Sequence, residues 1–129
     1  YFGATDGEHG YELWKTDGTE AGTVMVKDLN VGENSSLSWG STEHWHGEYT
    51  LTHGEHFYFS ADDGESGQEL WRTDGTESGT EIVVDVHQGE NGSWPWWLTS
   101  VGDKIYFTAW DGDQRQLWHY WDNPGPILS

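Results

Sequence analysis

The chain lacks several of the residues on which common functions depend. It contains no cysteine, and only five of its 129 residues are lysine or arginine, against 23 aspartates and glutamates. Without cysteine it can form no disulfide, thiol nucleophile or thiolate metal site. A formal net charge of −18 leaves no basic patch that could neutralise a phosphate backbone, and no run approaches the roughly 18 apolar residues of a spanning helix. We therefore expect no nucleic-acid partner and no membrane insertion.

Aromatic residues are abundant instead, with ten tryptophans, six tyrosines and four phenylalanines. Acidic chains with a hydrophobic content of 33% are often disordered. Each buried aromatic side chain, however, removes about 150–250 Å² from water, so these rings can supply a core that the few leucines, isoleucines and valines cannot. We expect a single domain over residues 1–129, with a tryptophan-centred core beneath an acidic surface.

An internal repeat organises the chain. When residues 1–36 are laid over residues 58–93, 23 of 36 positions are identical without a gap. A third, degenerate copy begins at Tyr106, which follows Tyr58 by 48 residues. Similarity at a fixed period is typical of repeat architectures. It divides the domain into a partial unit (1–36), a full unit with a His- and Trp-rich insert (37–93) and a degenerate partial unit (94–129).

Within each unit the pattern predicts short strands and tight turns. Residues 104–109 and 57–61 alternate apolar and polar side chains with the period of two of a half-buried strand. The other strands that we expect are at 48–52, 69–73, 81–86 and 97–101. Asp-Gly pairs between these runs suit hairpin turns, because both residues adopt positive φ at low cost. Each full unit is thus predicted to be a four-stranded antiparallel meander.

Four-stranded antiparallel units with a period of 40 to 50 residues are typical of the blades of a β-propeller. The predicted fold class is therefore all-β, with propeller-like blades in about two and a half units and about ten strands. Known propellers have about four or more blades. Either the chain is a piece of a longer array, or several copies assemble to complete a ring or an open stack.

The segments 12–23 and 69–80 both carry the pattern Glu-Leu-Trp-x-Thr-Asp-Gly-Thr-x-x-Gly-Thr. This pattern resembles a repeat of large secreted or surface proteins of bacteria, usually regarded as propeller-like. The third copy departs from it after Trp118, where His119 begins a different sequence. The resemblance implies an extracellular or cell-surface, non-enzymatic module, and it transfers no catalytic residue to this chain.

Acidic, glycine-containing loops are the first candidate sites, because calcium prefers clustered carboxylate and carbonyl oxygens. The candidate calcium ligands are Asp6, Glu8, Asp63, Glu65, Asp111 and Asp113. The alternative is that these residues serve only the turns, since Asp-Gly is also the ordinary hairpin dipeptide. Neither the EF-hand spacing nor the glycine-rich calcium nonapeptide is present. Calcium is the one cofactor that the loops suggest, as a stabilising ion.

A second candidate site lies in the insert, where four of the seven histidines fall within residues 43–56. His44 and His46 share one face of an extended segment, and His53 can approach His56 across a hairpin. Together they offer a nitrogen set for zinc or copper. The alternative is that they are ordinary surface histidines on an acidic protein.

Tryptophans form the third group of candidates. Trp14, Trp71 and Trp118 recur at one repeat position, which favours a packing role. The tryptophans that we place in the variable connections are Trp39, Trp45, Trp94, Trp96, Trp97 and Trp110. Indole faces beside polar groups suit stacking on sugar rings. Aromatics are also enriched at the cores of interfaces, so contacts between blades or subunits are the alternative.

Two Asn-x-Ser triplets, at Asn34 and Asn91, occupy equivalent positions and are candidate glycosylation sites.

No nucleophile elbow, phosphate-binding glycine loop or zinc-protease motif is present. The leading hypothesis is a non-enzymatic extracellular module that associates with itself or with neighbouring repeats in a surface or matrix assembly. The alternatives are a carbohydrate-binding module that uses the loop tryptophans, and a metal-dependent enzyme at the histidine-rich insert.

Overall fold

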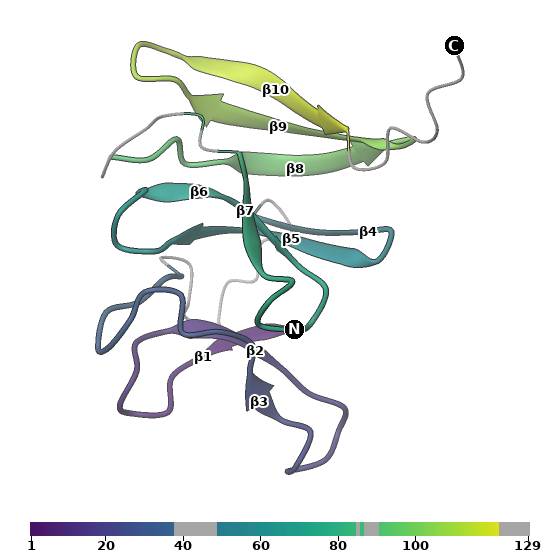
Figure 1. The fold of residues 1–129 in the computed structure, drawn as a ribbon. Coiled ribbons are helices and arrows are strands. Elements are labelled where there is room, and N and C mark those ends of the chain that lie inside the picture. The colour runs from purple at the N-terminus through teal and green to yellow at the C-terminus, as the bar shows by residue number, and fades with distance from the viewer. Residues whose placement is uncertain (38–48, 85, 87–90, 122–129) are drawn as a thin grey trace.

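The computed structural model describes residues 1–37, 49–84, 86 and 91–121. These residues form ten strands and no helix, so within them nothing helical is long and apolar enough to cross a membrane. The strands make three antiparallel sheets that lie one above another (Figure 1). The all-β class and the antiparallel meanders predicted from the sequence are confirmed. The described strands close no barrel.

Each sheet pairs strands in the order of the chain. The first sheet contains β1 (Phe2–Ala4), β2 (Glu12–Lys15) and β3 (Val24–Met25). The second contains β4 (Thr50–His53), β5 (His56–Asp62), β6 (Gln68–Thr73) and β7 (Glu81–Val84). The third contains β8 (Trp96–Val101), β9 (Lys104–Trp110) and β10 (Arg115–Trp121). The strands predicted from residue 49 onward all form, with shifts of one or two residues at their ends.

The register of the three sheets is the same at their centres. Phe2 lies opposite Trp14 in the first sheet, Phe59 opposite Trp71 in the second, and Phe107 opposite Trp118 in the third. In each sheet, therefore, the phenylalanine of the Tyr-Phe strand shares one face with the tryptophan of the Leu-Trp strand. Because side chains alternate across a strand, the leucine before each tryptophan points to the other face.

Two apolar cores lie between the packed sheets. The first lies between the first and second sheets, where Leu13 packs near Phe57, Phe59 and Trp71. The second lies between the second and third sheets. It contains Tyr58, Leu70, Leu98, Ile105, Phe107 and Ala109. The second sheet is thus covered on both faces, and its central Tyr58 and Phe59 are fully buried.

The Thr-Asp-Gly-Thr loop joins β6 to β7 through its own side chains. Asp74 Oδ1 accepts hydrogen bonds from Thr76 N at 2.9 Å and from Thr76 Oγ1 at 2.6 Å. The hydroxyls of Thr73 and Thr80 are 2.7 Å apart and close the base of the loop. Gly75 has a φ of 97°, a backbone conformation that residues other than glycine rarely adopt. Residues 16–23 make the corresponding bonds between β2 and β3, so the motif is a turn that fixes the angle of its hairpin.

Candidate functional site

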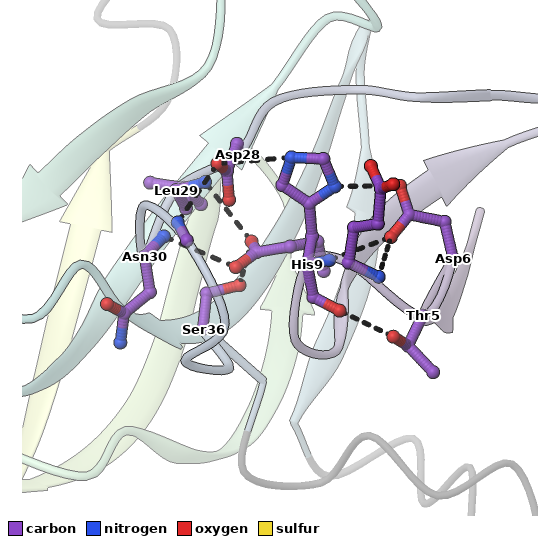
Figure 2. A network of polar contacts seen from close by, with 10 residues as sticks. Thr5, Asp6, His9, Asp28, Leu29, Asn30 and Ser36 are labelled. Carbon is purple, nitrogen blue, oxygen red and sulfur yellow. Dashed lines mark hydrogen bonds and ion pairs between the residues drawn. The ribbon is translucent and has the colours of Figure 1, made fainter.

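A buried carboxylate joins the first sheet to the second. Glu12 on β2 has no exposed surface. Its carboxylate accepts hydrogen bonds from Leu29 N at 3.2 Å, from Asn30 N at 3.3 Å and from the hydroxyl of Ser36 (Figure 2). Burial raises the pKa of Glu12 to about 7, although these hydrogen bonds oppose the shift. The segment around Ser36 is thereby held against the end of the first sheet.

The same junction occurs between the second and third sheets. Glu69 is fully buried and accepts hydrogen bonds from the hydroxyl of Ser93 and, at 3.2 Å, from Val86 N. The carbonyl of Ser36 accepts a bond from Asp62 N on β5 at 2.8 Å, and that of Ser93 accepts one from Trp110 N on β9 at 2.7 Å. Each serine therefore links a buried glutamate of one sheet to the backbone of the next.

These junctions give the Asn-x-Ser triplets a structural role. Ser36 and Ser93, the third residues of the triplets, are fully buried and bound to glutamate. Asn34 and Asn91 are exposed. The duplicated triplet is accounted for by the serine that each junction requires, and glycosylation of the asparagines stays a prediction.

A charged network surrounds the first junction (Figure 2). Asp6 Oδ2 lies 2.7 Å from His9 Nδ1, and Asp28 Oδ2 lies 3.7 Å from His9 Nε2. Hydrogen bonds from the backbone N–H groups of His9 and Glu8 lower the pKa of Asp6 to about 2. The hydrogen bond with Asp6 raises the pKa of His9. The second unit has Ser66 at the position of His9, so this network belongs to the first unit alone among the described turns.

Sequence reasoning missed Glu12, Ser36, His9 and Asp28. Glu12, Asp28 and Ser36 left a signal, because all three are identical in the second copy. Because glutamate is almost never fully buried, the residue type of Glu12 predicted an exposed side chain. His9 stood outside the histidine-rich insert and matched no residue of the other copies.

The predicted calcium ligands are divided among three separate turns. Asp6, Asp63 and Asp111 each use Oδ1 to accept two backbone N–H bonds of their own turn, at 2.7 to 2.9 Å. The other three candidates, Glu8, Glu65 and Asp113, are exposed. Within the described residues, no group of three or more metal-binding side chains is brought together. The turn role, which the sequence offered as the alternative, explains the three aspartates.

The predicted histidine site is only partly described. His53 and His56 lie opposite each other at the β4–β5 hairpin, as predicted. His44 and His46 lie outside the described residues. The transition-metal hypothesis therefore stays a prediction for this insert.

Two candidate tryptophans, Trp96 and Trp110, lie on strands, which corrects their placement in variable connections. Trp96 begins β8, and Trp110 ends β9. Trp97 also belongs to β8, within the strand predicted at 97–101. The strand β8 therefore begins one residue before the predicted range of 97–101. Its pairing with β9 shifts register between Trp96 and Thr99, and Trp97 has a φ of 58°. Trp94 precedes β8 with a φ of 53°. Trp39 and Trp45 lie outside the described residues.

Trp96 on β8 stacks on Tyr49, the residue that precedes β4. Its ring centroid lies 5.6 Å from that of Tyr49, with an interplanar angle of 6°. It also lies 5.7 Å from the ring centroid of Trp97, with an interplanar angle of 12°. The Trp97 side chain is 55% exposed, and that of Trp94 is 48% exposed. The stack therefore ends in an indole that is accessible to a ligand or a partner.

The outer side of the third sheet carries an exposed apolar surface, which we call the open face. It consists of Val101, Trp110, Leu117 and Trp121. Leu117 lies opposite Thr108, and both Val101 and Trp121 lie opposite Lys104. These positions alternate with Ile105, Phe107 and Ala109, which point into the second core. The open face is thus the side of the third sheet that no described sheet covers.

Comparison of the chain with protein-family models, with curated proteins and with solved structures gave no match.

Proposed function

We propose that the chain is a non-enzymatic, extracellular repeat module that associates with further copies of its own unit in a surface or matrix assembly. Its units are proposed to be propeller-like blades. The resemblance of residues 12–23 and 69–80 to repeats of bacterial surface proteins supports the location and the propeller-like character. The stack of antiparallel sheets supports an architecture in which neighbouring units cover each other's faces.

One observation carries the proposal. Leu13, Leu70 and Leu117 precede the tryptophan of their Leu-Trp strands and occupy one repeat position. Leu13 is 1% exposed and Leu70 is 0% exposed, because each is covered by the following sheet, but Leu117 is 70% exposed. A leucine side chain contributes about 1.5–3 kcal/mol when it is fully buried. The third sheet therefore carries the apolar residue of a sheet-to-sheet contact whose partner is another unit.

The open face also has the composition of an interface. It combines two tryptophans with two aliphatic residues, and aromatic side chains are enriched at the centres of protein interfaces. Polar side chains lie among these apolar ones, because Lys104 lies opposite both Val101 and Trp121, and Arg115 lies opposite Trp110. Trp121 Nε1 also donates to Asp103 at 2.6 Å. Tryptophan beside arginine is typical of surfaces that bind protein.

Sedimentation velocity over about a hundredfold range of concentration tests this function. We expect the mean mass of the wild-type chain to rise above 14.6 kDa with concentration. Leu117→Gln is expected to weaken association at least about tenfold. The matched control is Val31→Gln, because Val31 is 78% exposed but lies in the first unit, away from the open face. A wild-type chain that stays monomeric throughout would refute the proposal.

Carbohydrate binding is the second candidate, favoured by the geometry of Trp94 and Trp97. A positive φ is rare for bulky residues and is retained mainly where the surrounding structure requires it. Both residues present exposed rings, and the Tyr49–Trp96–Trp97 stack supports the second of them. Titration calorimetry with neutral oligosaccharides tests this role: heat of binding that Trp97→Ala abolishes and Trp110→Ala retains would support it. No binding by the wild type would exclude it.

A further inference from the structure

We infer that the open face binds the outer face of the first sheet of a second copy, so that chains associate head to tail. We call this second surface the head face and define it by Phe2, Ala4 and Trp14. The inference depends on the proposed function and adds the partner surface and the direction of assembly. It follows from how the sheets of one chain already contact each other.

The two internal contacts follow one directional rule. At the first, Leu13 of the earlier sheet meets Phe57, Phe59 and Trp71 of the later sheet. At the second, Leu70 of the earlier sheet meets the later sheet's Ile105, Phe107 and Ala109, with Trp118 packed against them. The earlier sheet thus contributes its leucine, and the later sheet contributes its Phe-x-Ala strand and its tryptophan.

A tyrosine follows the same rule. Tyr1 of the first sheet stacks on Phe57 of the second, with centroids 4.7 Å apart at 10°. Tyr58, one repeat later, is fully buried in the core against the third sheet. Tyr106 is the next residue of this series and lies opposite His119 on the outer side of the third sheet. The third sheet therefore presents both Tyr106 and Leu117, the side chains with which an earlier sheet contacts a later one.

The first sheet presents the complementary set. Phe2, Ala4 and Trp14 occupy the repeat positions of Phe59, Ala61 and Trp71. Those three residues of the second sheet are 0%, 0% and 6% exposed, because the first sheet covers them. Phe2, Ala4 and Trp14 are each only partly buried, and Phe2 lies opposite Trp14 in register. They share a face turned away from Leu13, which points into the first core.

The head face and the open face are different surfaces, so their contact is heterologous. Such contacts close into rings when the rotation between copies allows it and otherwise continue as open arrays. An isologous dimer, in which one open face meets another, would bring two leucine-and-tyrosine faces together and leave both head faces exposed. The internal contacts contain no such pairing, which favours the head-to-tail arrangement.

Two variants, each blocked at one face, distinguish these arrangements. Leu117→Gln blocks the open face, and Phe2→Gln blocks the head face. In head-to-tail association each variant alone has lost one of the two surfaces that every contact needs, so each is expected to be monomeric. An equimolar mixture still offers one intact open face to one intact head face. It is therefore expected to form a dimer of twice 14.6 kDa and nothing larger.

Sedimentation in about 0.3 M NaCl, which screens the negative charge, measures these outcomes. Circular dichroism and thermal melting of each variant confirm that it is folded, and Ala4→Glu replaces Phe2→Gln if the latter unfolds. If the head-blocked variant associates as strongly as the wild type, the head-to-tail inference is wrong while the proposed function stands. If the wild type itself is monomeric, both fail. A mixture that remains monomeric, with an associating wild type, also overturns the inference.

Discussion

At the scale of single residues, Glu12 makes stability depend on pH in an unusual direction. Its pKa is raised from 4.5 to about 7, so the folded chain holds a proton that the unfolded chain releases. The stabilisation is therefore complete below pH 4.5 and is lost as the pH rises through about 7. At about 1.4 kcal/mol per pH unit, its full loss is on the order of 3 kcal/mol in the free energy of unfolding. Urea unfolding at pH 4.5 and 7.5 measures it.

Glu12→Gln is expected to flatten this dependence, because the amide does not titrate. His9 changes stability in the same direction, since its pKa is also raised and its contribution is lost as the pH rises through that pKa. The difference between wild type and Glu12→Gln isolates Glu12 from His9. Glu20→Gln, at an exposed position, is the control and should keep the wild-type slope. Equal slopes in wild type and Glu12→Gln would contradict the prediction.

Gly92 is a second residue on which a junction depends. It has a φ of 71°, and a Cβ built there would lie 2.3 Å from Gln68 N, an atom of the backbone. Gly7 has a φ of 90° but nothing within 4 Å of such a Cβ. Both alanine variants strain the backbone, but only Gly92→Ala must also displace a strand. We expect it to lower the free energy of unfolding by about 1–3 kcal/mol more than Gly7→Ala, measured by urea denaturation. Equal losses would show that the close approach carries no cost.

The sequence predicted the polar turns better than the buried polar groups. Asp63 and Asp111 precede glycines, and their turns form through local hydrogen bonds that depend only on neighbours in the chain. Glu12 becomes buried only because Ser36, 24 residues away, brings a later segment over it. Burial of that kind is a property of the assembled sheets, which local patterns do not encode.

At the scale of strands and sheets, equivalent leucines have unequal importance. Leu70→Ala opens a cavity in the second core and is expected to lower the free energy of unfolding by about 2–5 kcal/mol. Leu117→Ala changes an exposed position and should alter it by less than about 0.5 kcal/mol. Denaturation at a protein concentration low enough for monomers compares the two variants. Similar losses at both positions would mean that the open face is covered in the single chain.

The strands themselves were largely predictable, and their exceptions have a local cause. The alternation of Ile105, Phe107 and Ala109 records directly which side chains reach the core. Trp97 breaks such a pattern because it adopts a positive φ within β8, a conformation rare for a bulky residue. The relative exposure of Leu70 and Leu117 was not predictable, since it depends on which sheets are present to cover them.

At the scale of the whole molecule, the net charge of −18 opposes both compactness and association. Salt shortens the distance over which these charges repel, from about 30 Å at 0.01 M to about 10 Å at 0.1 M. We therefore expect the melting temperature, and the affinity between copies, to rise between about 0.01 and 0.3 M NaCl. Differential scanning fluorimetry and sedimentation measure the two effects.

Calcium chloride and sodium chloride can be compared to distinguish charge screening from specific binding of calcium. Asp6, Asp63 and Asp111 already accept backbone hydrogen bonds with one carboxylate oxygen each, and they stand in three different turns. A calcium ion would meet one turn aspartate at a time, so its effect should be that of charge screening. At equal ionic strength, calcium chloride and sodium chloride are expected to give melting temperatures within about 2 °C. A much larger rise with calcium, reversed by a chelator, would show that the ion binds specifically and that the acidic turns converge on it in the assembled protein.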